Sequence, residues 1–224
     1  GAVFALGGLG VILLALKGLP MVAVPQRLHG SMDSFELLAV PMFLLMSNVL
    51  LKGGVGRDLY AAVQSWVGHW PGGLGVATIL SCTLFSAISG SSVATAATIG
   101  TVAIPEMVAR GYDRRFVFGM LAAGGTLGIL IPPSIPLIVY GVISESSIPT
   151  LFLAGIGPGL FLATVFTLYG MVHARFSGTY EPIGRASWRE RGTATLGALP
   201  TILLATAVVG SIYLGIATPS ESAG

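Results

Sequence analysis

Charged residues are scarce in this chain of 224 residues. Lysine, arginine, aspartate and glutamate together make up 9% of it, whereas 54% is hydrophobic, and a soluble domain carries about 25% charged residues. This deficit excludes an ordinary soluble domain and predicts a membrane protein. The basic residues are spread through several loops, so the net charge of +2 forms no basic patch of the kind that binds nucleic acid.

Cysteine and histidine are also scarce. The one cysteine, Cys82, stands in an apolar run without a partner for an internal disulfide, so we expect a buried, inert thiol. The histidines, His29, His69 and His173, fall in or beside loops and interfaces, and no cluster has metal-ligand spacing. A serine nucleophile needs a base within hydrogen-bond reach. We therefore expect no enzyme, and an intramembrane serine enzyme stays as an alternative.

Glycine and proline, in contrast, are abundant, with 32 and 13 copies. Spanning helices accept them only where neighbours, hydroxyl groups or water satisfy the freed backbone groups. We therefore expect an all-α polytopic membrane protein with interrupted helices. The expected apolar segments are Ala2–Leu16, Phe35–Leu51, Phe116–Ser144, Leu151–Ala174 and Thr195–Ile216.

Two polar segments separate these runs. The polar loop Gln26–Ser34 leads into the second run, where Pro41 falls in the first turns and its missing N–H matters least. Residues 175–193 are rich in arginine, and the positive-inside rule predicts that this segment is a cytoplasmic loop.

Residues 53–71 have an amphipathic pattern. Apolar residues recur at helical spacing, while Arg57 and Asp58 fall on the opposite face. The pattern predicts a helix that lies in the membrane interface, with Trp66 and Trp70 at headgroup depth. A helix packed on protein would show the same pattern, so that alternative stays open.

An uncharged run covers residues 71–105. As one helix it would be about 52 Å long, against a hydrocarbon core of about 30 Å, and it is too short for two full spans joined by a turn. Its length predicts a re-entrant hairpin over 72–109. Gly90 suits the left-handed end of the first helix, and Ser91 or Ser92 can cap the second. The positive-inside rule does not decide this point, because a hairpin and a single span leave the same excess of basic residues on one side.

The motif GGTLGILIPPS interrupts the next apolar run. Because Pro132 and Pro133 have no N–H, carbonyl groups one turn earlier lose their helical donors, which predicts a discontinuous helix within 110–174. Two interrupted segments close together are a pointer to a transporter's binding site. For the later motif GIGPG, residues 155–159, we favour close helix packing instead.

The two interruptions predict one site. Hydroxyl and carbonyl oxygens suit a hard cation such as Na⁺, and the N-terminus of a half-helix suits a carboxylate. Small residues that only allow close packing are the alternative. The candidate ion and substrate residues are Ser89, Gly90, Ser91, Ser92, Thr95, Gly125, Thr126, Gly128, Pro132, Pro133 and Ser134. The Na⁺ ligands are expected among Ser89, Ser91, Ser92, Gly125 and Thr126, and no other cofactor is expected.

Four stretches also resemble one known family, in the family's order. They are LLAVPMFLLMSNVLLKGG, FSAISGSSVATAATIGTVAIPEM, GGTLGILIPPSIPLIVYGVISESSIPTLFLAGIGPG and GIATPSESAG. They are similar to the large membrane subunit of tripartite ATP-independent periplasmic (TRAP) transporters. The resemblance implies an ion-transporter-superfamily fold of inverted repeats, with an elevator-type transport domain that slides against a scaffold. It also implies Na⁺-driven import of organic acids across a bacterial inner membrane. The implied partners are a small four-helix membrane subunit, a periplasmic substrate-binding protein and membrane lipids.

This resemblance assigns each part of the chain a place. The chain would hold about one repeat and the first helix of the next, so we expect a partial chain whose second hairpin is missing. Residues 1–52 and 194–224 would belong to the scaffold, and 53–71 would form an arm helix. The hairpin 72–109 and the segment 110–174 would form the transport domain. A non-transporting assembly subunit is the second alternative, since it would keep the packing glycines without needing the two interruptions.

Overall fold

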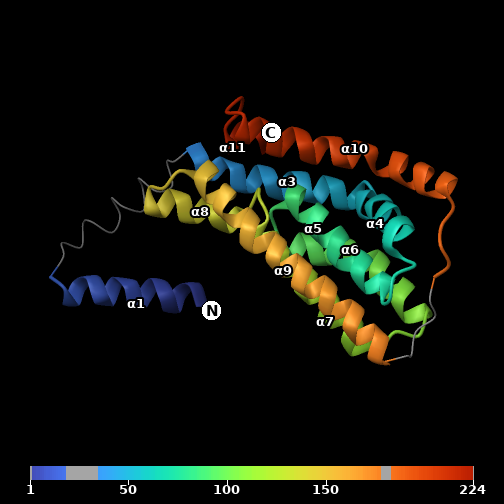
Figure 1. The fold of residues 1–224 in the computed structure, drawn as a ribbon. Helices are drawn as coiled ribbons and strands as arrows, with labels where there is room; N and C mark the ends of the chain where they lie inside the picture. Colours follow the sequence, from blue (N-terminus) through green and yellow to red (C-terminus); the bar gives the residue numbers. More distant parts are fainter. Residues whose placement is uncertain (1, 19–34, 178–182, 224) are drawn as a thin grey trace.

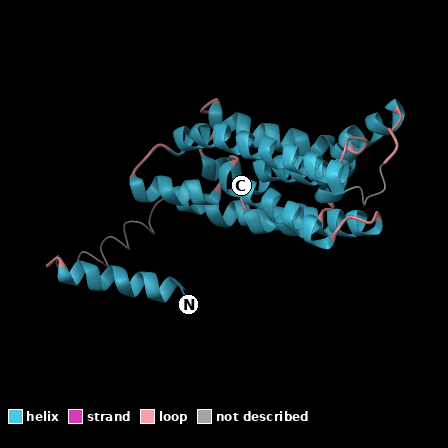
Figure 2. Cartoon of the chain, turned by 60° about the horizontal axis from the view of Figure 1, so that its bottom comes forward, coloured by secondary structure: helices cyan, strands magenta, loops and turns pink. Residues whose placement is uncertain are grey.

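The computed structural model describes residues 2–18, 35–177 and 183–223, and all elements in these ranges are helices (Figures 1 and 2). Helix α1 covers Ala2–Leu16, as predicted, and lies apart from the other helices in Figure 1. The predicted all-α class is therefore confirmed. The predicted loop Gln26–Ser34 lies outside the described residues.

The described helices include four that are long and apolar enough to cross a membrane. They are Ser92–Ala109, Arg114–Ser144, Ile148–Phe176 and Trp188–Tyr213. A fifth candidate is a bent pair, Glu36–Lys52 and Val55–Val67, whose axes differ by 70°. This set of apolar helices confirms that the chain is a polytopic membrane protein.

The second predicted helix begins with a short 3-10 turn, η1 (Phe35–Leu38), and continues as α3 (Ala39–Lys52). Pro41 falls in the first turn of α3, where no intrahelical N–H is required, as expected. Gly54 then takes a φ of 77° and turns the chain into α4 (Val55–Val67). A residue without Cβ adopts this left-handed conformation without steric cost, which produces the sharp bend.

Helix α4 is the amphipathic helix expected within 53–71. Leu59, Ala62 and Val67 are buried, and α4 packs against α5, α6 and α10. Trp66 and Trp70 remain 45% and 40% exposed. One face of α4 therefore packs on protein, which is the alternative left open above, while the placement of its tryptophans at headgroup depth stays a prediction.

The centre of the fold is a helical hairpin of α5 (Gly73–Ser89) and α6 (Ser92–Ala109). Helix α7 (Arg114–Leu130) packs on both hairpin helices, and α8 (Ile135–Ser144) continues its direction beyond the hairpin's tip for about 15 Å. Helix α9 (Ile148–Ser177) then runs back along α7 and α5 (Figure 1). The buried thiol of Cys82 belongs to this core, as expected.

The arginine-rich segment is shorter than predicted, because α9 continues to Ser177 and α10 (Trp188–Tyr213) begins before Thr195. A capping box starts α10: the Ser187 hydroxyl accepts from the Glu190 N–H, and the Glu190 carboxylate accepts from the Ser187 N–H. This reciprocal bonding satisfies two helix-end donors, and its sequence signal is SWRE, residues 187–190. A short helix, α11 (Pro219–Ala223), follows and packs on α3.

The glycines of the GIGPG motif pack against the interrupted helix. A Cβ on Gly155 would lie 2.5 Å from the carbonyl oxygen of Leu130, and one on Gly159 would lie 2.9 Å from the Cγ1 atom of Ile131. A Cβ on Gly157, between them, would meet nothing within 4 Å. The packing interpretation of this motif is therefore confirmed, and the contact lies where α7 ends.

This contact predicts unequal effects of two Gly→Ala substitutions in the complete protein. Gly155→Ala forces a methyl group against the Leu130 carbonyl and should destabilise the protein by about 1–3 kcal/mol. Gly157→Ala, the matched control on the same helix, should leave stability unchanged or slightly raised, since alanine favours helix. Thermal unfolding midpoints measure both, and equal midpoints for the two variants would contradict the packing.

Candidate functional site

Gly90 and Ser91 form the turn between the two hairpin helices. Gly90 has a φ of 61°, and its N–H donates to the Ser86 carbonyl at 3.1 Å, which ends α5. The Ser91 hydroxyl caps α6 by accepting from the Ala94 N–H at 3.4 Å. The sequence prediction of a left-handed glycine followed by a serine cap is confirmed.

The backbone leaves helical form again over residues 131–134, between α7 and α8. Pro132 and Pro133 lie here and have no N–H to donate to the carbonyls one turn earlier. The hydroxyl of Ser134 replaces one missing donor, because it donates to the carbonyl of Ile129. The predicted discontinuous helix is therefore confirmed at the predicted prolines.

The hairpin tip and the helix break are in direct contact. The N–H of Ile135, the first residue of α8, donates to the Gly90 carbonyl at 3.1 Å. A Cβ on Gly90 would lie 2.6 Å from the Pro133 carbonyl oxygen, and one on Gly128 would lie 2.9 Å from the backbone of Ser91. The two interruptions, far apart in sequence, thus form one structural unit in which glycines let the backbones touch.

Behind the tip, three hydroxyl groups from α5 and α6 form a buried cluster. The hydroxyls of Ser89 and Thr95 are 2.8 Å apart, and that of Ser86 lies 3.5 Å from Thr95. All three residues are 0% exposed. Ser86 was missed by sequence reasoning, although it precedes Ser89 by three residues and therefore lies on the same face of the helix.

A fourth hydroxyl reaches the tip from α3. Ser47, which is 2% exposed, donates to the Ser89 carbonyl at 2.9 Å and also contacts the Phe43 carbonyl at 2.7 Å. Sequence reasoning missed this residue, because a serine in the middle of an apolar helix ordinarily bonds its own preceding turn. Only the fold provides the second acceptor.

Of the remaining predicted site residues, most are buried near the tip or the break, whereas one is exposed. A Cβ on Gly125 would lie 2.9 Å from the Ala96 Cβ and 3.3 Å from the Ser92 carbonyl oxygen, so α7 touches the start of α6 here. Pro132, Pro133 and Ser134 are buried at the break. Thr126 is exposed, and its hydroxyl donates to the Ala123 carbonyl. The described contacts therefore do not connect the Thr126 side chain to the tip.

Helix ends of both polarities meet at this site. Helices α5 and α7 end here with carbonyl groups, and α6 and α8 begin here with N–H groups, so partial negative and partial positive charge lie close together. The sequence has no charged residue within 71–105 or 116–144. This arrangement can hold a cation on hydroxyl and carbonyl oxygens and an anionic group on the N–H ends.

The site lacks the partners of a serine nucleophile. The described hydroxyls at the tip bond to hydroxyl and backbone groups. His173 stacks on Phe116 at 4.5 Å, near the opposite end of α7, and His69 lies beside Trp70. In the residues that the structure describes, no group of three or more His, Cys, Asp or Glu residues is placed to hold a metal ion, and His29 lies outside them.

A helical hairpin whose tip meets a broken helix is typical of membrane transport proteins built from discontinuous helices. That this hairpin is re-entrant stays a prediction, because α6 by itself is long and apolar enough to cross a membrane. The sequence profile of the family described as "Tripartite ATP-independent periplasmic transporter, DctM component" matches residues 1–224. The chain belongs to this family, as its motifs predicted. Members are bacterial inner-membrane proteins, which agrees with the apolar helices and confirms the predicted localisation.

Three curated relatives illustrate the similarity. The chain is 39% identical to the C4-dicarboxylate TRAP transporter large permease protein DctM of Rhodobacter capsulatus, over 94% of the chain and 51% of the relative. It is 40% identical to the ectoine TRAP transporter large permease protein TeaC of Halomonas elongata, over 91% and 47%. It is 36% identical to the sialic acid TRAP transporter large permease protein SiaM of Vibrio cholerae, over 88% and 46%. These names are those of permeases and argue against the enzyme alternative.

The chain spans about half the length of the curated relatives it matches. Its one hairpin and one broken helix are therefore compared with only part of each relative.

The contact between tip and break predicts a difference between two left-handed glycines. Gly90→Ala and Gly54→Ala both place a Cβ at a positive φ, which costs about 1–2 kcal/mol. Only the Cβ at Gly90 also meets the Pro133 carbonyl, whereas the one at Gly54 meets open space. We expect Gly90→Ala to lower the free energy of unfolding by about 1–3 kcal/mol more than Gly54→Ala.

Thermal unfolding of the purified complete protein checks this difference. An equal loss for both variants would mean that the tip does not pack against the break.

Proposed function

We propose that the complete protein is the membrane subunit of a Na⁺-coupled secondary importer of organic anions, and that the hairpin tip and helix break form part of its ion and substrate site. One observation carries the proposal: the hydrogen bond from the Ile135 N–H to the Gly90 carbonyl, which brings four helix ends to one place. Non-helical backbone survives at membrane depth only where it is buried in protein or lines a wet cavity. A pair of interruptions that meet in this way is suited to binding.

The buried hydroxyl cluster is the part of the site that is suited to binding a cation. Ser86, Ser89 and Thr95 supply hydroxyl oxygens beside the carbonyls at the end of α5. Hard cations prefer such neutral oxygen ligands together with carbonyls. The uncharged surroundings also favour a monovalent ion, because a divalent one usually requires carboxylates, and the sequence has none in these segments.

The N-terminal ends of α6 and α8 support an anionic substrate. Ser91 and Ser134 stand at these ends. The Ala94 N–H is already bonded to the Ser91 hydroxyl, and the Ile135 N–H to the Gly90 carbonyl. The described contacts give the N–H groups of Ser92, Val93 and Leu137 no acceptor, so these are the groups left for a carboxylate. The relatives' names include C4-dicarboxylate and sialic acid, both of which carry carboxylate groups. The apolar runs of this chain hold no deep arginine for bidentate carboxylate binding, so helix ends and the second half of the protein would have to provide the selectivity.

The transport step we propose is an elevator motion of the hairpin, α7, α8 and α9 against a scaffold that includes α3 and α10. Ser47 of α3 bonds the Ser89 carbonyl at the tip. If α3 stays fixed, this bond breaks each time the hairpin moves. The motion would carry the bound ion and anion past α3 without opening the tip.

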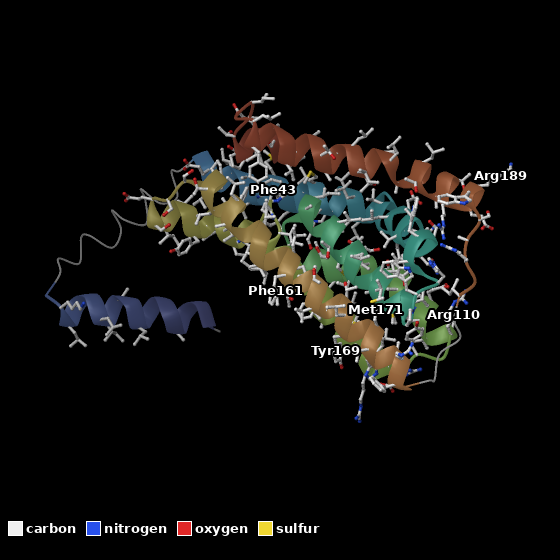
Figure 3. All side chains as sticks on the ribbon, in the orientation of Figure 1. Phe43, Arg110, Phe161, Tyr169, Met171 and Arg189 are labelled. Carbon is white, nitrogen blue, oxygen red and sulfur yellow. The ribbon has the colours of Figure 1, made fainter. Side chains whose placement is uncertain are left out.

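Two further proteins complete the proposed importer: a small membrane subunit and a periplasmic binding protein that delivers substrate. Figure 3 shows Phe161 and Tyr169 projecting outward from α9, and both side chains are exposed. Such a face requires lipid, the second half of the protein or a membrane partner to cover it.

The hydroxyl of Thr95 provides a test of the ion site. Thr95→Val keeps the shape of the side chain but removes its hydroxyl from the Ser89 contact, so the Na⁺ concentration for half-maximal uptake should rise about tenfold. Thr206→Val is the control, because that hydroxyl is exposed and donates only to its own helix at the Ile202 carbonyl. Na⁺-dependent uptake into proteoliposomes with the complete transporter measures both. An unchanged Na⁺ dependence in Thr95→Val would remove this cluster from the ion site.

Cross-linking tests the proposed motion. In a cysteine-free background of the complete protein, cysteines are introduced at Gln64 of α4, which follows α3 in the proposed scaffold, and at Glu106 of the hairpin helix α6. These two side chains are 3.3 Å apart, only partly buried and outside the proposed site. After joining them with a short, thiol-cleavable reagent, uptake should stop and should return after reduction, while either single cysteine should be unaffected by the reagent. Full uptake in fully cross-linked protein would show that α4 and the hairpin move together.

A further inference from the structure

One end of the helix bundle concentrates arginine and tryptophan. Arg110 and Arg189 lie at this same end in Figure 3. Helix α10 begins here, and Trp188, its first residue, is 78% exposed. Trp66 of α4 packs edge to face against Trp188, with ring centroids 6.1 Å apart and an interplanar angle of 80°.

Arg191 fills the corner between these two rings. Its guanidinium carbon lies 5.3 Å from the Trp66 ring centroid and 5.2 Å from that of Trp188, so the cation faces two electron-rich surfaces. Trp66 is fixed in turn, because its Nε1–H donates to the Thr195 hydroxyl at 3.1 Å. Arg191 is only 6% exposed, which is unusual for an arginine at a helix start.

Part of the Arg191 guanidinium lacks an acceptor among the residues that the structure describes. Its Nε and Nη2 atoms are buried and have no hydrogen-bond partner. Glu190, the neighbouring acid, is occupied by the Ser187 N–H in the capping box, and in the described residues the one ion pair joins Arg110 to Glu106 at the end of α6. A buried charge without a partner is costly, so Arg191 requires an anionic group that these residues do not supply.

We propose that Arg191, between Trp66 and Trp188, binds the phosphate of an anionic phospholipid. A phosphate accepts two hydrogen bonds from a guanidinium side by side, and exposed indoles beside arginine are typical of headgroup depth. The exposed Leu196, Leu199 and Leu203 continue along one face of α10 and offer the acyl chains an apolar surface. The headgroup reaches Arg191 by displacing the ring of Trp188, which is the exposed wall of the corner.

Lipid retention by the complete transporter tests this site. The protein is reconstituted in vesicles of phosphatidylglycerol and phosphatidylcholine, extracted gently and weighed intact by native mass spectrometry. Wild type should retain one more phosphatidylglycerol molecule than Arg191→Gln, with about tenfold stronger retention at that position. Arg189→Gln, which removes an exposed arginine two residues earlier, should match wild type.

Two further measurements distinguish a phospholipid phosphate from free inorganic phosphate as the anion at Arg191. In wild type, phosphatidylglycerol should raise the thermal unfolding midpoint above that in pure phosphatidylcholine, while inorganic phosphate alone should not. Equal phosphatidylglycerol retention by wild type and Arg191→Gln would overturn the proposal. So would stabilisation by inorganic phosphate alone, or loss of the second subunit from Arg191→Gln with unchanged lipid retention, since the latter identifies a protein carboxylate as the partner. The wild-type measurement keeps the test decisive even if Arg191→Gln does not fold.

Discussion

The contact between Gly90 and the α7–α8 break is the constraint on which the rest of the structure depends. Lipid offers no hydrogen bonds, so every backbone group that a break releases must find a partner in the protein, in a water-filled cavity or in a ligand. Here the Ile135 N–H bonds the Gly90 carbonyl, the Ser134 hydroxyl bonds the Ile129 carbonyl, and Ser47 bonds the Ser89 carbonyl. The two interruptions are thus stable because each satisfies part of the other.

Glycines on both sides of the break let the helices approach closely enough for these hydrogen bonds to form. Gly125 and Gly128 bring α7 onto the hairpin tip, while Gly155 and Gly159 bring α9 onto the last residues of α7. A Cβ at any of these positions would lie within 3 Å of a neighbouring atom. The polar, non-helical centre is therefore held in a tightly packed frame, which keeps its helix ends in place for a ligand.

The two ends of α7 lie among different kinds of polar group. The tip is uncharged and uses backbone ends and hydroxyls, whereas the opposite end of α7, about 25 Å away, carries the Arg110 turn, and the arginines at the start of α10 lie at that same end. Charges at the ends and neutral polar groups in the middle follow from the cost of placing a charge in lipid. The proposed ion and substrate site and the proposed lipid site consequently lie in different parts of one bundle.

The helix class, the hairpin, its Gly90 turn and the break at Pro132 and Pro133 were all predictable from the sequence, because length, glycine and proline act locally on the backbone. The capping box at Ser187 is a local signal of the same kind. Three contacts are visible only in the folded chain: the tip meets the break, Ser47 reaches Ser89, and Arg191 lies between two tryptophans. These contacts join residues from separate helices, and their partners follow from how the helices pack, which no local pattern encodes.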